Sequence, residues 1–196
     1  MKSLLLHVTF QTLLTKSKRM GKQYASLTPE DMNFINDQPL FYIASASGQE
    51  VNLSPRGFEC ARVIDANMMI FLDYPGSGDR TARDIRDGGE VTVVFNAFKG
   101  AAKILRLFCK GELIEKEHAG FSEYLSLFDE EEKMVRRIVR LHIYAVESSC
   151  GMGVPKMQLQ HQRNGLQKWI KSMNEKGSLQ TYIDEHAIAP NLKDIR

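Results

Sequence analysis

The sequence that decides the fold reads VNLSPRG at residues 51–57 and DYPGSGDRTA at residues 73–82. In the first segment, the strand period of two places Asn52, Ser54 and Arg56 on one face and the apolar residues on the other. Amides and hydroxyls can hydrogen-bond the carbonyls and imide of a planar ring, and a guanidinium suits phosphate or another anionic oxygen. This segment predicts either one wall of a ligand site or an edge strand with a solvated polar face.

The second segment, residues 73–82, joins a predicted strand to a short predicted helix. Its glycines free the backbone to approach a ligand, and a helix start offers unpaired N–H groups. Ser77, Arg80 and Thr81 add donors and positive charge. The segment lacks the Gly-Lys-Ser/Thr ending of a P-loop and the βαβ unit of a dinucleotide fingerprint. It predicts either a phosphate cradle or a plain glycine turn capped by Asp79.

Strand signatures surround both segments, with β-branched and aromatic residues bounded by turn formers. The predicted strands are residues 40–45, 50–54, 59–64, 68–74, 90–96, 104–114 and 137–146. Their short connections favour antiparallel neighbours, because a parallel crossover needs about a dozen residues or more. We therefore expect a mainly β fold, a Greek-key-like antiparallel barrel or sandwich with peripheral helices.

Predicted helices precede, interrupt and follow this strand pattern at defined places. The clearest one runs to about residue 37 and begins at Thr28 and Pro29, where a hydroxyl cap and a proline precede two acidic residues. The other predicted helices are residues 81–87, 116–128, 159–173 and 179–185.

Composition places the chain among globular proteins. It has 196 residues, of which 43% are hydrophobic and 26% charged, which predicts about one folded domain. The apolar runs are far shorter than the ~20 residues that a membrane-spanning helix needs, so no membrane partner is expected.

Charge and cysteine content narrow the partners. The first 29 residues carry five basic and no acidic side chains, whereas the remainder holds 21 basic and 24 acidic residues. The body is therefore mildly acidic, which argues against a nucleic-acid partner. Cys60, Cys109 and Cys150 are odd in number and widely spaced, and neither they nor the five histidines form a metal-binding pattern. No metal and a reducing, cytoplasmic location are expected.

The first 20 residues are basic and hydroxylated, which leaves two interpretations open. They are an organellar transit peptide, or Met20 is the true start and the residues before it are an extension of no structural consequence. The expected organisation is a leader or disordered extension at 1–20, a barrel domain at 21–155 and a helical tail packed on it at 156–196.

Taken together and in this order, the two segments and a later LRLFCKG at residues 105–111 resemble the pyridoxamine 5′-phosphate oxidase-like family of split β-barrels. The resemblance covers about residues 24–182. It implies an FMN-binding split barrel, usually a homodimer with the flavin at the subunit interface, and an oxidoreductase acting on an unknown small molecule. The alternatives are a non-catalytic flavin-binding or stress-associated module, or a haem-binding split barrel.

The resemblance also implies roles for particular residues. The strand with Asn52, Ser54 and Arg56 would line the ring and ribityl chain, Ser77, Arg80 and Thr81 would hold the phosphate, and Arg106 would reach the flavin from a neighbouring strand. The full set of expected cofactor-binding residues is Asn52, Ser54, Arg56, Gly57, Asp73, Tyr74, Ser77, Gly78, Arg80, Thr81 and Arg106. Arg106 could instead lie on a solvated face, and no catalytic residue is identified.

The substrate side departs from the family pattern. True pyridoxamine phosphate oxidases are expected to carry an Arg-x-Val-Leu-Leu-Lys run and an Arg-Leu-x-Pro tail, whereas this sequence reads NLKDIR at residues 191–196. The cofactor site is expected to be kept and the substrate site replaced. The glycine-containing segment 148–155, which includes Cys150, would either cover the open side of the flavin or link the barrel to the helical tail.

Overall fold

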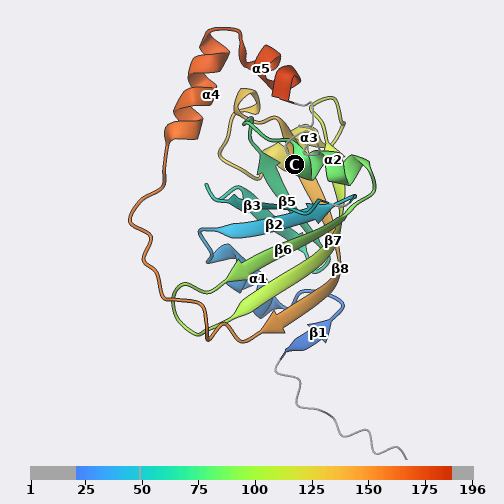
Figure 1. Cartoon of the computed structure of the whole chain (residues 1–196), viewed down its shortest axis with the longest axis vertical. Helices are drawn as coiled ribbons and strands as arrows, with labels where there is room; N and C mark the ends of the chain where they lie inside the picture. Colours follow the sequence, from blue (N-terminus) through green and yellow to red (C-terminus); the bar gives the residue numbers. More distant parts are fainter. Residues whose placement is uncertain (1–20, 49, 187–196) are drawn as a thin grey trace, which may run out of the picture.

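The computed structural model describes residues 21–48 and 50–186, so the expectations for residues 1–20 and 187–196 lie outside the described residues. The chain forms a strongly curved antiparallel sheet with helices around it (Figure 1). The strands are β1 (Lys22–Tyr24), β2 (Phe41–Ala46), β3 (Asn52–Arg56), β4 (Ala61–Asp65), β5 (Met68–Asp73), β6 (Glu90–Asn96), β7 (Ile104–Ile114) and β8 (Arg137–Ser149). The helices are α1 (Pro29–Asn36), α2 (Arg80–Arg86), α3 (Phe121–Leu125), α4 (Gly165–Glu175) and α5 (Leu179–His186), with a 3₁₀ turn at Glu132–Met134.

The sheet runs in the order β3-β2-β6-β7-β8-β5-β4, and β1 adds to β8. Its two end strands, β3 and β4, are consecutive in the chain, so the sheet forms a half-barrel that is split between them. All seven predicted strands are present, and the expectation of a mainly β split barrel with peripheral helices is confirmed. The three-residue strand β1 was not predicted, because its pairing with Glu147 and its neighbours in β8 leaves no local signal.

The core fills the concave side of the half-barrel. Alternate residues of the central strands point inward and are fully buried, among them Ile43, Val93, Leu107 and Leu141. The aromatic ring of Phe41 packs between Phe71 and Phe95, which joins the two ends of the sheet across the core. Within the described residues, no helix has the length and apolar character needed to cross a membrane.

Two helix predictions need correction. The helix expected at 116–128 is confined to α3, because Gly120 stands at its N-cap and the preceding residues form turns. The helix expected at 159–173 begins only at Gly165. Residues 155–164 instead form neither helix nor strand and run as an open trace from the barrel to α4 (Figure 1). The cap at Thr28 is confirmed, since Thr28 and Asp31 form a reciprocal capping box.

Helix α2 lies against the barrel and carries part of the candidate site. Ile85 packs directly over Gly111 of β7, where an added Cβ would lie 2.6 Å from the isoleucine side chain. At the other flank, the Asp84 carboxylate accepts hydrogen bonds from Ser45 Oγ at 2.6 Å and Ser47 Oγ at 2.8 Å. These contacts fix where the first turn of α2, with Arg80 and Thr81, meets the split.

Candidate functional site

A pocket of about 830 Å³ lies at the split of the barrel. It is bounded by β3, the end of β5, the glycine-rich loop and the first turn of α2. The expected site residues that line it are Asn52, Ser54, Arg56, Gly57, Asp73, Tyr74, Ser77, Gly78, Arg80 and Thr81. The structure thus brings together the two sequence segments that were expected to form one site.

The polar face of β3 points into the pocket. Asn52, Ser54 and Arg56 are half-buried, whereas Val51 and Leu53 point outward and are 73% and 65% exposed. β3 is an edge strand, as one interpretation expected, but its polar residues face the pocket and its apolar residues face solvent. A strand that turns its donors inward and its apolar side chains outward is adapted to a ligand and to a surface contact.

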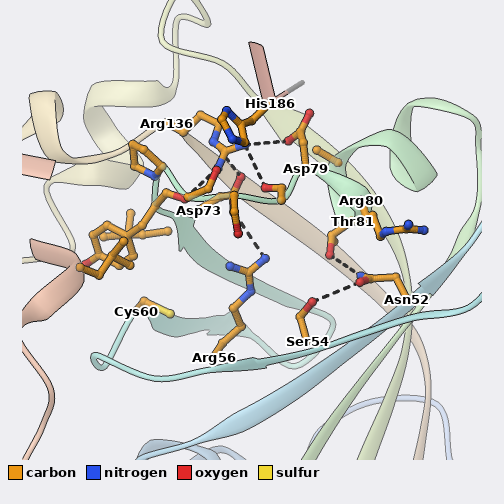
Figure 2. Close-up of a pocket in the computed structure, with 18 of the residues that line it drawn as sticks. Asn52, Ser54, Arg56, Cys60, Asp73, Asp79, Arg80, Thr81, Arg136 and His186 are labelled. Atoms are coloured by element: carbon orange, nitrogen blue, oxygen red, sulfur yellow. Dashed lines mark hydrogen bonds and ion pairs between the residues drawn. The ribbon is translucent and has the colours of Figure 1, made fainter. Parts of the chain in front are cut away.

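The β3 row is connected to α2 by side-chain hydrogen bonds (Figure 2). The Asn52 amide donates to Thr81 Oγ1 at 3.0 Å and to Ser45 Oγ at 3.1 Å. Ser54 Oγ donates to the Asn52 carbonyl oxygen at 3.2 Å. Arg80 lies beside this group, is half-buried, and has no hydrogen-bond or ion-pair partner among the described residues.

The glycine-rich loop is organised by an arginine that the sequence analysis missed. Arg136, at the entry to β8, is 7% exposed and donates to the carbonyls of Tyr74 at 3.1 Å and Gly78 at 3.2 Å. Gly76 and Gly78 face open space, since a Cβ built on either would meet nothing within 4 Å. The loop is thus held from behind by one guanidinium and leaves its front free for a ligand.

Two buried carboxylates pair with the arginines behind the loop. Asp79 Oδ1 accepts from Arg136 at 3.1 Å and also from Arg137, while its other oxygen accepts from Arg86 at 3.1 Å. Burial by itself would raise the pKa of Asp79, but these guanidinium groups outweigh burial and hold the pKa below its ordinary value. Asp79 makes no side-chain cap to α2, so the expectation of a plain turn capped by Asp79 is wrong.

Asp73 links this network to the β3 row. Its carboxylate lies 3.5 Å from the Arg56 guanidinium and 3.8 Å from Arg136 Nε. Neither Arg56 Nε nor Arg136 Nε has a hydrogen-bond partner in the described part of the chain, although both atoms are buried. A buried donor without a partner costs free energy, and the Asp73 carboxylate beside both guanidinium groups offsets part of that cost.

The apolar side of the pocket contains Phe58, Cys60 and Tyr74. The rings of Phe58 and Tyr74 meet edge to face at 6.0 Å. Burial raises the pKa of the Cys60 thiol to about 12, so this cysteine is protonated at neutral pH and is a poor nucleophile. This wall suits the face or edge of an aromatic ring better than it suits covalent chemistry.

The C-terminal helices also reach the pocket, which no local sequence signal predicts. Leu166 of α4 and Glu185 and His186 of α5 line its rim. The His186 ring stacks on Tyr182 at 3.9 Å, and its Nδ1 lies 2.9 Å from the Tyr182 carbonyl oxygen. Because a carbonyl only accepts, Nδ1 donates this hydrogen bond, and Nε2 has no hydrogen-bond partner among the described residues.

Two expected features lie away from this pocket. Arg106 of β7 pairs with Glu147 at 3.2 Å and Ser149 at 3.1 Å, and it does not line the pocket of its own chain. Its contact with a flavin stays a prediction. Gly151 packs against the backbone of Lys103, so in the described chain this segment joins the barrel to the tail and does not reach the pocket.

Comparison with known proteins supports the same fold. No family model matches the chain. The Aspergillus flavus pyridoxamine 5′-phosphate oxidase family protein ustO is 33% identical in an alignment of 141 residues that covers 69% of this chain and 57% of that protein. The chain thus spans a little over half the length of this relative.

Solved structures also resemble the chain. A candidate pyridoxamine 5′-phosphate oxidase from Lactobacillus delbrueckii superposes with a TM-score of 0.50 at 19% identity, covering 62% of this chain and 93% of that chain. HupZ of Group A Streptococcus superposes with a TM-score of 0.48 at 21% identity, covering 61% of this chain and 91% of that chain. The first superposition supports the split-barrel fold.

Proposed function

The chain belongs to the pyridoxamine 5′-phosphate oxidase-like family, and on this basis we propose that its pocket binds FMN and that the protein is an FMN-dependent oxidoreductase acting on a small molecule. When bound, FMN supplies the redox chemistry, while the protein positions it and tunes it electrostatically.

The observation that carries the proposal is the unpaired guanidinium of Arg80 at the split. Arg80 lines the pocket and has no hydrogen-bond or ion-pair partner among the described residues. A phosphate-bearing ligand would supply the anionic oxygens that this guanidinium lacks.

Each part of FMN has residues suited to it. Ser77, Arg80 and Thr81 would hold the phosphate in front of the glycine loop, where Gly78 leaves the space free. The β3 row would hydrogen-bond the ribityl chain and the polar edge of the ring, and the Tyr74 side of the pocket would receive the ring itself. The volume of about 830 Å³ lies within the usual range of cofactor sites, about 300–1,000 Å³.

The purified protein tests this directly. We expect a yellow protein with a flavin absorption spectrum that releases FMN, and no FAD, on heat denaturation. A colourless protein whose spectrum stays unchanged after incubation with excess FMN would refute the proposal. Reduction of the bound flavin by NADH or NADPH under air would then separate an oxidoreductase from a non-catalytic flavin module.

A haem-binding split barrel is the second candidate, because His186 lies at the pocket rim and its Nε2 has no hydrogen-bond partner in the described part of the chain. The same spectrum decides between the two, since bound haem gives a Soret band and flavin does not. A Soret band after haem addition that His186→Ala abolishes would favour haem over FMN.

We also propose a homodimer that uses the outer face of the sheet. One row of direct cross-strand neighbours crosses β3, β2, β6, β7 and β8. Its members, in that order, are Leu53, Ala44, Thr92, Phe108 and Ala145. Four of these five side chains are apolar and Leu53 is 65% exposed, so this row favours association of two copies. Light scattering should give twice the monomer mass of 22.3 kDa, and Leu53→Glu should shift it toward the monomer. A wild-type mass equal to the monomer would contradict the dimer.

A further inference from the structure

We call the pocket at the split of the barrel, for which FMN binding is proposed, the cofactor pocket. A second cavity of about 1080 Å³ lies next to it, on the other side of the turn that follows β3. Six large apolar side chains line it: Phe34, Leu40, Phe58, Phe98, Met157 and Leu159. They come from α1, the start of β2, the β3–β4 turn, the β6–β7 loop and the segment before α4. We call this cavity the apolar groove.

The outer wall of the apolar groove is the extended segment 155–164, which we call the strap. In Figure 1 the strap runs as an orange trace along one side of the molecule, apart from the sheet. Its Met157 N–H donates to the Phe98 carbonyl at 3.1 Å, and Gln162 Oε1 lies 4.0 Å from the position of a Cβ on Gly57. The strap is thus hydrogen-bonded to the barrel at Met157 and lies close to the β3–β4 turn at Gln162, and the groove lies between these two points.

The apolar groove and the cofactor pocket meet at one turn. Gly57 and Phe58 line both cavities. Phe58 and Glu59 have φ angles of 66° and 54°, a left-handed conformation that costs free energy for a bulky residue. This backbone places the Phe58 ring against Tyr74 at the boundary, so a molecule in the groove would lie beside the ligand of the cofactor pocket.

Charge at the groove is balanced, which selects the kind of occupant. Lys99 and Arg163 face Glu30 and Asp37 around its rim. The fifth charge, Lys103, is already neutralised because its Nζ donates to Asp31 at 2.7 Å and lies 4.7 Å from the Phe34 ring. The lining therefore favours neither an anion nor a cation, and an uncharged apolar body fits it.

We propose that the apolar groove binds the uncharged, ring-bearing part of the small-molecule substrate, with Phe58 between it and the cofactor. That the bound molecule is a substrate rests on the proposed function, whereas its binding in the apolar groove does not. A concave cavity of this volume that shares Gly57 and Phe58 with the cofactor pocket suits a small molecule, and the outer row through Leu53 is the better surface for a second copy.

Prodan, an uncharged naphthalene whose fluorescence increases and shifts to the blue in apolar sites, provides the probe. We expect saturable prodan binding to the full-length protein and a change in the spectrum of bound FMN on prodan addition. Leu159→Glu places a charge in the groove and should weaken prodan binding by about tenfold or more. Leu127→Glu is the matched control, because Leu127 is 47% exposed and Leu159 48% exposed, but only Leu159 lines the groove.

The outcomes separate the inference from the proposed function. Prodan that fails to bind, or that is weakened equally by Leu159→Glu and Leu127→Glu, overturns the apolar groove as a ligand site. A Leu159→Glu protein that loses its dimer mass assigns the groove to a second copy and also overturns the inference. A protein that binds prodan in a Leu159-dependent way but takes up no FMN keeps the groove and refutes the cofactor proposal alone.

Discussion

The two ends of the cofactor pocket differ in how completely their polar groups are paired (Figure 2). At the buried end, Asp79 and Arg136 are each at least nine-tenths buried and are bound to several partners. At the open end, Asn52 and Thr81 bond to one another while Arg80 has no partner among the described residues. We infer that the buried end maintains the shape of the loop and the open end binds the ligand. Substitutions should therefore affect stability at one end and affinity at the other.

The largest effect is expected at Asp79. Asp79→Asn removes the charge that three arginines share and leaves Arg136 and Arg137 buried without their main partner. Breaking a buried ion pair from one side costs about 3–5 kcal/mol of folding free energy. Urea unfolding of the flavin-free protein measures this loss of folding free energy. Glu131→Gln, at an exposed ion pair, is the control, and an equally small loss for both variants would contradict a structural role for Asp79.

Acid should remove part of the same stabilisation. Burial would raise the pKa of Asp31 and Asp79, but hydrogen bonds from Lys103, Tyr24 and Thr28 at Asp31, and the arginines at Asp79, lower both pKa values. A carboxyl with a lowered folded pKa contributes stability above about pH 4 and loses it as the pH falls through the folded value. Thermal midpoints should fall on acidification, and less steeply in Asp79→Asn. A thermal midpoint that does not change in acid would be evidence against stabilisation by these ionised carboxylates.

At the open end, Arg80→Ala should weaken FMN binding by about 1.5–3 kcal/mol, the scale of a hydrogen bond to a charged group, and leave the free energy of unfolding unchanged. Riboflavin, which has no phosphate, should bind both proteins alike. Fluorescence titration measures both ligands. Arg106→Ala is the informative companion, because Arg106 lies outside the pocket of its own chain. Loss of affinity in that variant would mean that a second copy contacts the flavin.

The smallest effect is expected at Ser54. Ser54→Ala removes one neutral hydroxyl that faces the pocket and donates to Asn52. A neutral hydrogen bond contributes about 0.5–1.5 kcal/mol, so FMN affinity should fall by about two- to tenfold with no loss of stability. If Ser54→Ala lowers the unfolding free energy more than it lowers FMN affinity, then β3 belongs to the structural end of the pocket.

The open end was predictable from sequence, and the buried end was not. Asn52, Ser54 and Arg56 lie on one face because a strand alternates its side chains, and Arg80 and Thr81 follow a glycine loop at a helix start. Arg136 gave no signal, because it lies about 60 residues further along the chain and meets the loop only through the pairing of β5 with β8.

The other differences between the sequence-based predictions and the structure also arise from tertiary structure. The period of two in β3 was read correctly, but which face turned inward depended on the position of β3 at the split edge of the barrel. Residues 159–164 of the strap were predicted as the start of a helix from their local pattern, whereas in the structure they form neither helix nor strand. His186 reaches the pocket only because α4 and α5 fold back over it.

The central claim is that the open end recognises a flavin through its phosphate. The most direct test compares the dissociation constants of FMN and riboflavin for the flavin-free wild-type protein in one fluorescence titration series. We expect FMN to bind about 10- to 150-fold more tightly, which corresponds to about 1.5–3 kcal/mol for the charged contacts at Ser77, Arg80 and Thr81. Equal affinity for the two flavins, or no saturable binding of either, would contradict the account.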